Sequence, residues 1–143
     1  LDLSIQILKM GFKTALISDA FVYHKRRTSL KQFARQVYNF GVARITISKR
    51  HPKTLKILHF APALFVIGSL FLLLLSILIH ALFFVPLLIY MLVVFTDASV
   101  QNRSLSIGSL AVMTSFVQLF GYGLGFIKAY FIQHVLEKKM FID

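Results

Sequence analysis

Two long uncharged runs dominate the second half of the chain. Residues 57 to 96 contain no Asp, Glu, Lys or Arg. At about 1.5 Å per helical residue this run is about 60 Å long, enough to cross a hydrocarbon core of about 30 Å twice. Residues 104–127 form a second run, long enough for one more crossing. Within a transmembrane region at 57–143 we expect spans at about 58–79, 83–96 and 105–127, with the polar stretch 96–104 as a loop in water.

Residues 28–56 show the pattern of an amphipathic helix. Ser29 and Gln32 have the spacing of a capping box. Apolar residues then recur at helical intervals: Leu30, Phe33, Val37 and Phe40. Pro52 is expected to end this helix. Because basic residues are dense here, we expect the helix to lie in the headgroup layer, with its apolar face toward the hydrocarbon.

Residues 1–27 combine a short helix with two short strands. The helix is indicated by apolar residues at helical spacing and by Gly11 at its end. The apolar runs on either side of Asp19 are typical of strands joined by a turn. So short a stretch cannot bury a core alone. We therefore expect the edge of a larger α/β domain, and a chain that is a piece of a longer protein.

Composition and charge place the chain in a membrane. Hydrophobic residues make up 57% of the sequence and the mean hydropathy is +0.77, which excludes an ordinary soluble domain. The formal net charge is +11, and every Lys and Arg precedes residue 58 except Arg103, Lys128, Lys138 and Lys139. The positive-inside rule therefore places the N-terminal segment in the cytoplasm, with a bacterial inner membrane as the expected location. Three spans would leave two lysines outside; alternatively, the third segment bends or stays interfacial.

The basic residues between Val22 and Arg44 alternate with aromatics, a pattern that would also suit RNA. They lie directly before a membrane span and match no binding module, so we expect no nucleic-acid partner. The chain has no cysteine, which excludes disulfides and thiolate metal sites.

His24 ends the second expected strand and is followed by Lys25, Arg26 and Arg27. An imidazole beside guanidinium groups would suit a divalent metal bound to a nucleotide diphosphate, with His24 on the metal and the arginines on the phosphates. The alternative is an interfacial histidine without a ligand. The local sequence alone favours that alternative, since one histidine does not make a metal site.

An ordered series of short motifs resembles the C-terminal part of membrane-bound family 2 glycosyltransferases, which have a GT-A nucleotide-sugar domain. Asp2 and Leu3 match the family's Asp-Leu at a helix start, Gly11 and Phe12 match its Gly-aromatic turn, and His24 matches its histidine. The resemblance covers residues 1 to about 50 by motif and the remainder by architecture only.

This resemblance implies a full-length enzyme that transfers a sugar from a nucleotide-sugar donor to a lipid-linked or polysaccharide acceptor, with a divalent cation (Mg or Mn). The family's catalytic base would lie just before Leu1, and no Asp-x-Asp metal motif occurs in the chain. The fragment alone is therefore expected to be inactive. The roles implied are Asp2 beside the base, His24 on the metal, and Arg26, Arg27 and Gln36 on the substrate or the diphosphate.

Processive members of this family carry Gln-x-x-Arg-Trp on the helix after the histidine. Here Gln36 is followed by Asn39 and Phe40, which favours transfer of one or a few sugars over polymerisation. The alternative class is a non-enzymatic membrane anchor or assembly subunit whose basic helix binds anionic lipid. That class predicts no dependence on His24 or Asp2.

Overall fold

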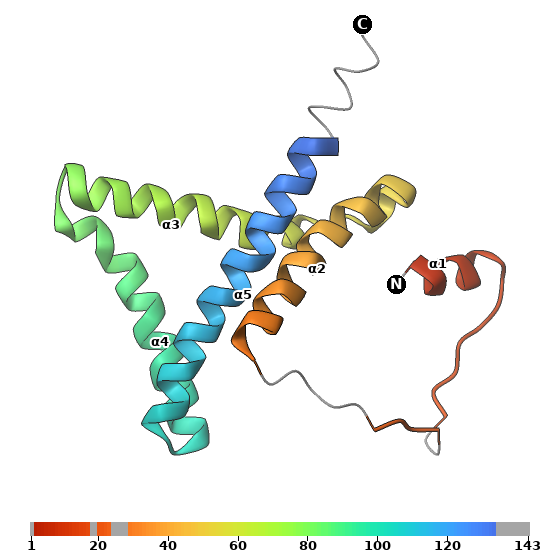
Figure 1. Cartoon of the computed structure of the whole chain (residues 1–143), viewed down its shortest axis with the longest axis horizontal. Helices are drawn as coiled ribbons and strands as arrows, with labels where there is room; N and C mark the ends of the chain where they lie inside the picture. The colour runs from red at the N-terminus through yellow and green to blue at the C-terminus, as the bar shows by residue number, and fades with distance from the viewer. Residues whose placement is uncertain (1, 18–19, 24–28, 134–143) are drawn as a thin grey trace, which may run out of the picture.

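The computed structural model describes residues 2–17, 20–23 and 29–133 and shows a mainly helical chain (Figure 1). Five α-helices are present in this part: α1 (Asp2–Lys9), α2 (Leu30–Arg50), α3 (Ala61–Leu78), α4 (Val85–Asn102) and α5 (Leu105–Phe131). Three short 3₁₀ turns connect them: η1 (Pro52–Thr54), η2 (Ile57–Phe60) and η3 (Ala81–Phe84).

The boundaries of α1 and α2 confirm the expectations from the sequence. α1 is followed by Gly11 with a φ of 83°, a conformation that favours glycine after a helix. At the start of α2, the Ser29 hydroxyl accepts a hydrogen bond from the Gln32 N–H at 3.3 Å. α2 ends at Arg50, two residues before Pro52.

Besides the apolar face that the sequence predicts to lie toward the hydrocarbon, α2 has a face that is buried inside the protein. Val37, Gly41, Ile45 and Ser48 are buried, whereas Phe40 is 54% exposed. The reason is the packing partner. The buried stripe runs along α5, and a face that contains a glycine allows closer contact between the two backbones than a face of large side chains.

Glycines bring α5 into contact with α2. A Cβ atom on Gly125 would collide with the backbone oxygen of Tyr38. One on Gly121 would lie 2.6 Å from Cγ2 of Val37. From the side of α2, a Cβ on Gly41 would lie 2.8 Å from the Phe126 nitrogen. None of these positions has room for a larger residue.

Two further glycines of α5 contact the other helices. A Cβ on Gly123 would lie 2.5 Å from the Pro62 oxygen, at the start of α3. One on Gly108 would lie 2.8 Å from the Phe95 oxygen, near the end of α4. The glycines of α5 thus allow close packing against three helices.

These contacts arrange α3, α4 and α5 as the sides of a triangle (Figure 1). The start of α3 meets α5 at Gly123, and the end of α4 meets α5 at Gly108. η3 joins the other two ends. Positions 108 and 123 are about 22 Å apart along a helix. The pair α3 and α4 is therefore a V-shaped hairpin, closed at η3 and held open by α5.

Aromatic rings connect the three sides. The Phe65 ring of α3 lies 5.1 Å from the Tyr90 ring of α4 and 5.9 Å from the Phe116 ring of α5, measured between centroids. The Tyr90 and Phe116 rings are 5.5 Å apart. Such pairs are favourable beyond the area that they bury, so they stabilise the triangle between its corners.

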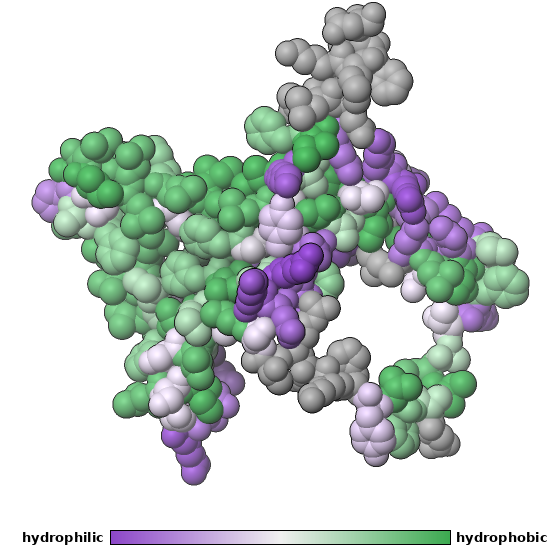
Figure 2. Space-filling view, in the orientation of Figure 1, coloured by the Kyte–Doolittle hydropathy of each residue, from purple (hydrophilic) through white to green (hydrophobic). Residues whose placement is uncertain are grey.

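Three segments of the described chain are long and apolar enough to span a membrane: Ile57–Leu78, Ala81–Asn102 and Leu105–Phe131. They support an integral membrane protein. Figure 2 shows hydrophobic residues over α3 and α4, and hydrophilic residues along α2 and at the turn between α4 and α5.

The sequence predicts a loop at the polar stretch 96–104. In the structure most of this stretch is helical, because α4 continues to Asn102. The Thr96 hydroxyl donates to the Leu92 oxygen at 2.7 Å, and the Gln101 amide donates to the Asp97 carboxylate at 2.8 Å. These polar side chains are satisfied within the helix, so they do not end it. The last helical residue is Asn102, and Arg103 after it has a φ of 50°.

The two strands expected around Asp19 are not formed: the described residues 12–17 and 20–23 contain no strand. A strand requires a neighbouring chain segment for its backbone hydrogen bonds, and this segment runs apart from the helices (Figure 1). The α/β edge expected at 1–27 is thus not seen in this part of the structure.

We predict that Gly125→Ala destabilises the protein by about 1–3 kcal/mol, because the added methyl group overpacks the contact with α2. The measurement is thermal unfolding in detergent. The matched control is Gly68→Ala in α3, where a Cβ meets no atom within 4 Å. That change should leave stability equal or slightly higher, since alanine favours helix. Equal melting temperatures for both variants would contradict the packing described here.

Candidate functional site

The structure separates Asp2 from Gln36, the two proposed site residues that it describes. His24, Arg26 and Arg27 lie outside the described residues. Asp2 lies beside Arg50, at the end of α2. Gln36 is near the start of α2. It is 14 residues from Arg50, which corresponds to about 21 Å along the helix. Asp2 and Gln36 therefore do not share one site in this structure.

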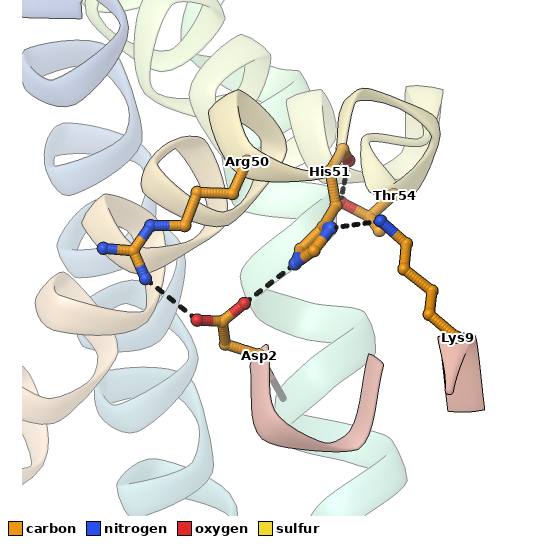
Figure 3. A network of polar contacts seen from close by, with 5 residues as sticks. All are labelled: Asp2, Lys9, Arg50, His51 and Thr54. Carbon is orange, nitrogen blue, oxygen red and sulfur yellow. Dashed lines mark hydrogen bonds and ion pairs between the residues drawn. The ribbon is translucent and has the colours of Figure 1, made fainter. Parts of the chain in front are cut away.

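Asp2 is the centre of a polar cluster, which we call the Asp2 cluster: Asp2, Lys9, Arg50, His51 and Thr54 (Figure 3). Nη1 of Arg50 donates to Oδ2 of Asp2 at 2.9 Å, and Nε2 of His51 lies 2.8 Å from Oδ1. The other ring nitrogen of His51 lies 2.9 Å from Nζ of Lys9. Both ends of α1 thus contact the end of α2.

Local chain chemistry positions each group. Asp2 is in the first turn of α1 and Lys9 is in the last, the arrangement that a helix dipole favours. His51 caps the end of α2, and the Thr54 hydroxyl donates to its backbone oxygen at 2.7 Å. This corner leaves the His51 side chain only 11% exposed. The imidazole is therefore held between this corner and the two ends of α1.

The contacts define the proton positions in the Asp2 cluster. A lysine ammonium group can only donate, so Nδ1 of His51 accepts and the ring proton is assigned to Nε2, which donates to Asp2. The hydrogen bond from His51, together with the hydrogen bond and charge of Arg50, lowers the pKa of Asp2 below its ordinary value. Its carboxylate is ionised at neutral pH, and both oxygens are engaged.

This chemistry suits attachment more than catalysis. A carboxylate with two strong donors is a poor general base, because deprotonating a substrate would first require breaking those bonds. The described residues also contain no group of three or more His, Cys, Asp or Glu side chains that could hold a metal ion. The Asp2 cluster is best described as a polar clamp between α1 and the end of α2.

Sequence reasoning identified Asp2 but missed its partners. Arg50 lies among the many basic residues of α2, and His51 follows them directly, so nothing in the local sequence distinguishes either as a partner of Asp2. The partners are 48 and 49 positions from Asp2. The only local signal is the His-Pro pair at positions 51 and 52, which marks a rigid corner.

Comparison with protein-family models, curated proteins and solved structures found no match to this chain. The class that the fold itself supports is an integral membrane protein in which a basic helix packs against an apolar three-helix triangle.

We predict that attachment of α1 depends on pH through Asp2. Because the pKa of Asp2 is lowered in the folded state, its stabilising contribution is complete above the unfolded value of about 3.9 and is lost as pH falls through the lower folded value. The protection factors of the α1 amides, which correct for the slower intrinsic exchange in acid, should therefore fall on acidification below about pH 4.

The matched variant is Asp2→Asn. Its α1 amides should have low protection factors already at pH 7, and these factors should change little on acidification. The α5 amides provide the internal control, since the hydrogen bonds of this cluster join only α1, η1 and the end of α2 within the described residues. Equal α1 exchange in both proteins at pH 7 would show that the carboxylate does not hold α1.

Proposed function

We propose that this chain is the C-terminal part of a membrane-bound family 2 glycosyltransferase. The full-length enzyme would transfer a sugar from a nucleotide-sugar donor to a lipid-linked or polysaccharide acceptor. One observation carries the proposal. Asp2, which matches the family's helix-start motif, lies in the first turn of a helix that is clamped to the end of the basic, membrane-proximal helix.

The clamp gives Asp2 a positioning role in this proposal. By binding Arg50 and His51, Asp2 fixes the start of α1 relative to α2. A catalytic base immediately before Leu1 would then be held at a defined distance from the membrane, where an acceptor confined to the bilayer presents its hydroxyl group.

The other roles rest on the resemblance. His24, Arg26 and Arg27 would contact the donor diphosphate and its cation, whose charge increases as the sugar leaves. The cation, Mg or Mn, belongs to the full-length enzyme, and none of the roles given to the described residues involves it. Gln36 is proposed as a substrate contact on the resemblance alone, since it lies far from the Asp2 cluster.

The triangle limits how the helices can cross the membrane. A bilayer has two faces, so two of the three corners of a closed triangle must share a face. At most two of the sides can therefore cross. The mean hydropathy of the three spans is 2.5, 2.2 and 1.6 in chain order, so α5 is the least apolar. We include in the proposal that α3 and α4 cross and that α5 lies along one face.

The position of α2 supports the same assignment. α2 runs beside the second half of α5, from Gly121 near Val37 to Gln133, whose amide donates to the Thr46 hydroxyl at 3.4 Å. The exposed side of α2 carries Lys31, Arg35, Lys49 and Arg50, which cannot be placed in hydrocarbon without large cost. The half of α5 beside it therefore lies at headgroup depth.

This placement removes the charge conflict that three spans create. The chain beyond Gln133 then starts on the same face as α2, so the lysines at 138 and 139 follow on the cytoplasmic side that the positive-inside rule favours.

We predict that single cysteines report this topology, since these 143 residues contain none and any cysteine elsewhere in the full-length protein can be replaced first. In the full-length protein, Asn102→Cys and Ile132→Cys should react with a membrane-impermeant maleimide from one side. Ile79→Cys, beside η3, should react from the other side. Intact cells and inverted vesicles distinguish the two sides. Labelling of position 132 together with position 79 would mean that α5 crosses the membrane.

We predict that His24→Ala lowers sugar transfer by about a hundredfold, because a contact to the developing diphosphate charge is lost. The measurement is transfer from a panel of radiolabelled nucleotide sugars into membrane lipid by the full-length protein. Lys31→Ala, an exposed position on α2, is the matched control and should keep activity. Protein content of the membranes must be equal.

Full activity of His24→Ala would remove this histidine from the site. A complete lack of transfer by the unaltered protein, with every donor, would instead favour the non-enzymatic membrane anchor.

A further inference from the structure

Two adjoining hollows lie where α2, η2 and α5 meet, and Arg44 and Tyr122 line both. The larger is about 490 Å³ and is otherwise lined by Phe40, Ala43 and Ile47 of α2. The smaller is about 290 Å³ and is otherwise lined by side chains from η2, α3 and α5: Leu58, His59, Pro62, Gln118 and Leu119. Arg44 is partly buried between them.

The polar groups here are donors without partners among the residues that the structure describes. The side chains of Arg44, Gln118 and Tyr122 make no hydrogen bond or ion pair in this part of the chain. Nδ1 of His59 accepts a hydrogen bond from the Lys56 N–H at 2.9 Å. The ring proton of neutral His59 is therefore on Nε2, which is left to donate.

No carboxylate balances these donors within the described chain. Asp2 is bound by Arg50 and His51, and Asp97 is bound by Gln101. A partly buried guanidinium without an anion is costly. Guanidinium, imidazole, amide and phenol groups around one space are suited to an oxyanion, and phosphate is the anion that arginine binds best through paired hydrogen bonds.

The walls around the donors favour a ligand with an apolar part over a free ion. The lining of the larger hollow is predominantly apolar, with Phe40 and Ile47 on one side. α2 and the second half of α5 lie together there, at the proposed depth of the headgroups. A phosphate attached to a hydrocarbon chain satisfies both the donors and the apolar walls.

We propose that the two adjoining hollows beside Arg44 together bind a membrane lipid, with Arg44 as the principal contact to its phosphate and His59, Gln118 and Tyr122 as further donors. The lipid chain lies against Phe40 and Ile47. The site is distinct from the Asp2 cluster and does not depend on sugar transfer.

The test uses the full-length protein in nonionic detergent and a fluorescent phosphatidic acid as the probe. Arg44→Gln should weaken binding about tenfold or more, the usual loss for a charge-assisted hydrogen bond. Arg44→Lys should recover part of it. The matched control is Arg35→Gln, an exposed cation on the same helix, which should change binding less than about twofold. Gln118→Leu provides a second variant that removes no charge and should weaken binding several-fold.

Three results would overturn the proposal. Equal losses in Arg35→Gln and Arg44→Gln would indicate general attraction to the basic helix. Equal binding of a fluorescent diacylglycerol would show that the phosphate is not recognised. Competition by inorganic phosphate at the concentration of the lipid would identify a free-phosphate site. Size-exclusion profiles show whether Arg44→Gln is misfolded. If it is, the binding of the lipid by Gln118→Leu decides whether the proposal holds. None of these readouts involves a nucleotide sugar, so failure here is separate from failure of the proposed enzyme activity.

Discussion

The close approach of α2 and α5 is the contact on which the rest of the architecture depends. Gly41, Gly121 and Gly125 allow the two backbones to meet where any larger side chain would separate them. In a membrane there is little hydrophobic gain from bringing apolar helices together, so packing of this kind supplies the association energy. Because α5 also contacts α3 and α4, one glycine-rich helix sets the position of all the others.

A chain of contacts then extends from the membrane helices to the N-terminal segment. α5 fixes α2, α2 ends at the corner formed by His51 and Pro52, and that corner binds Asp2. The first link is apolar and fits by shape, whereas the last is ionic and exposed to water. The two links respond to different conditions: overpacking disturbs the first, and acid or salt disturbs the second.

The sequence predicted those features that depend on neighbouring residues. The Ser29 cap, the end of α2 near Pro52 and the spacing glycine after α1 were all confirmed, because each is set within a few residues. The apolar helices at 58–79 and 105–127 followed from length and hydropathy alone. The end of the second span was missed because Thr96 and Gln101 find partners inside the helix, which composition does not reveal.

Features set by distant residues were not predictable. The face of α2 that packs inside the protein follows the glycines of α5, and the apolar pattern of α2 alone does not reveal it. The partners of Asp2 and the donors around Arg44 come from elements far apart in the chain, and no local pattern joins them. The prediction of strands around Asp19 was wrong for a related reason, since a strand is stable only beside another chain segment that pairs with its backbone.

The V shape of α3 and α4 has a consequence for the lipid around the protein. With both helices crossing as proposed, the hairpin is narrow at η3 and about 22 Å wider at the level of α5. The protein then occupies more area in one leaflet than in the other, and α2 adds to the wider side. The protein is therefore wedge-shaped. Many copies in one patch of membrane would curve that patch, with the leaflet at α5 on the convex side and the leaflet at η3 on the concave side.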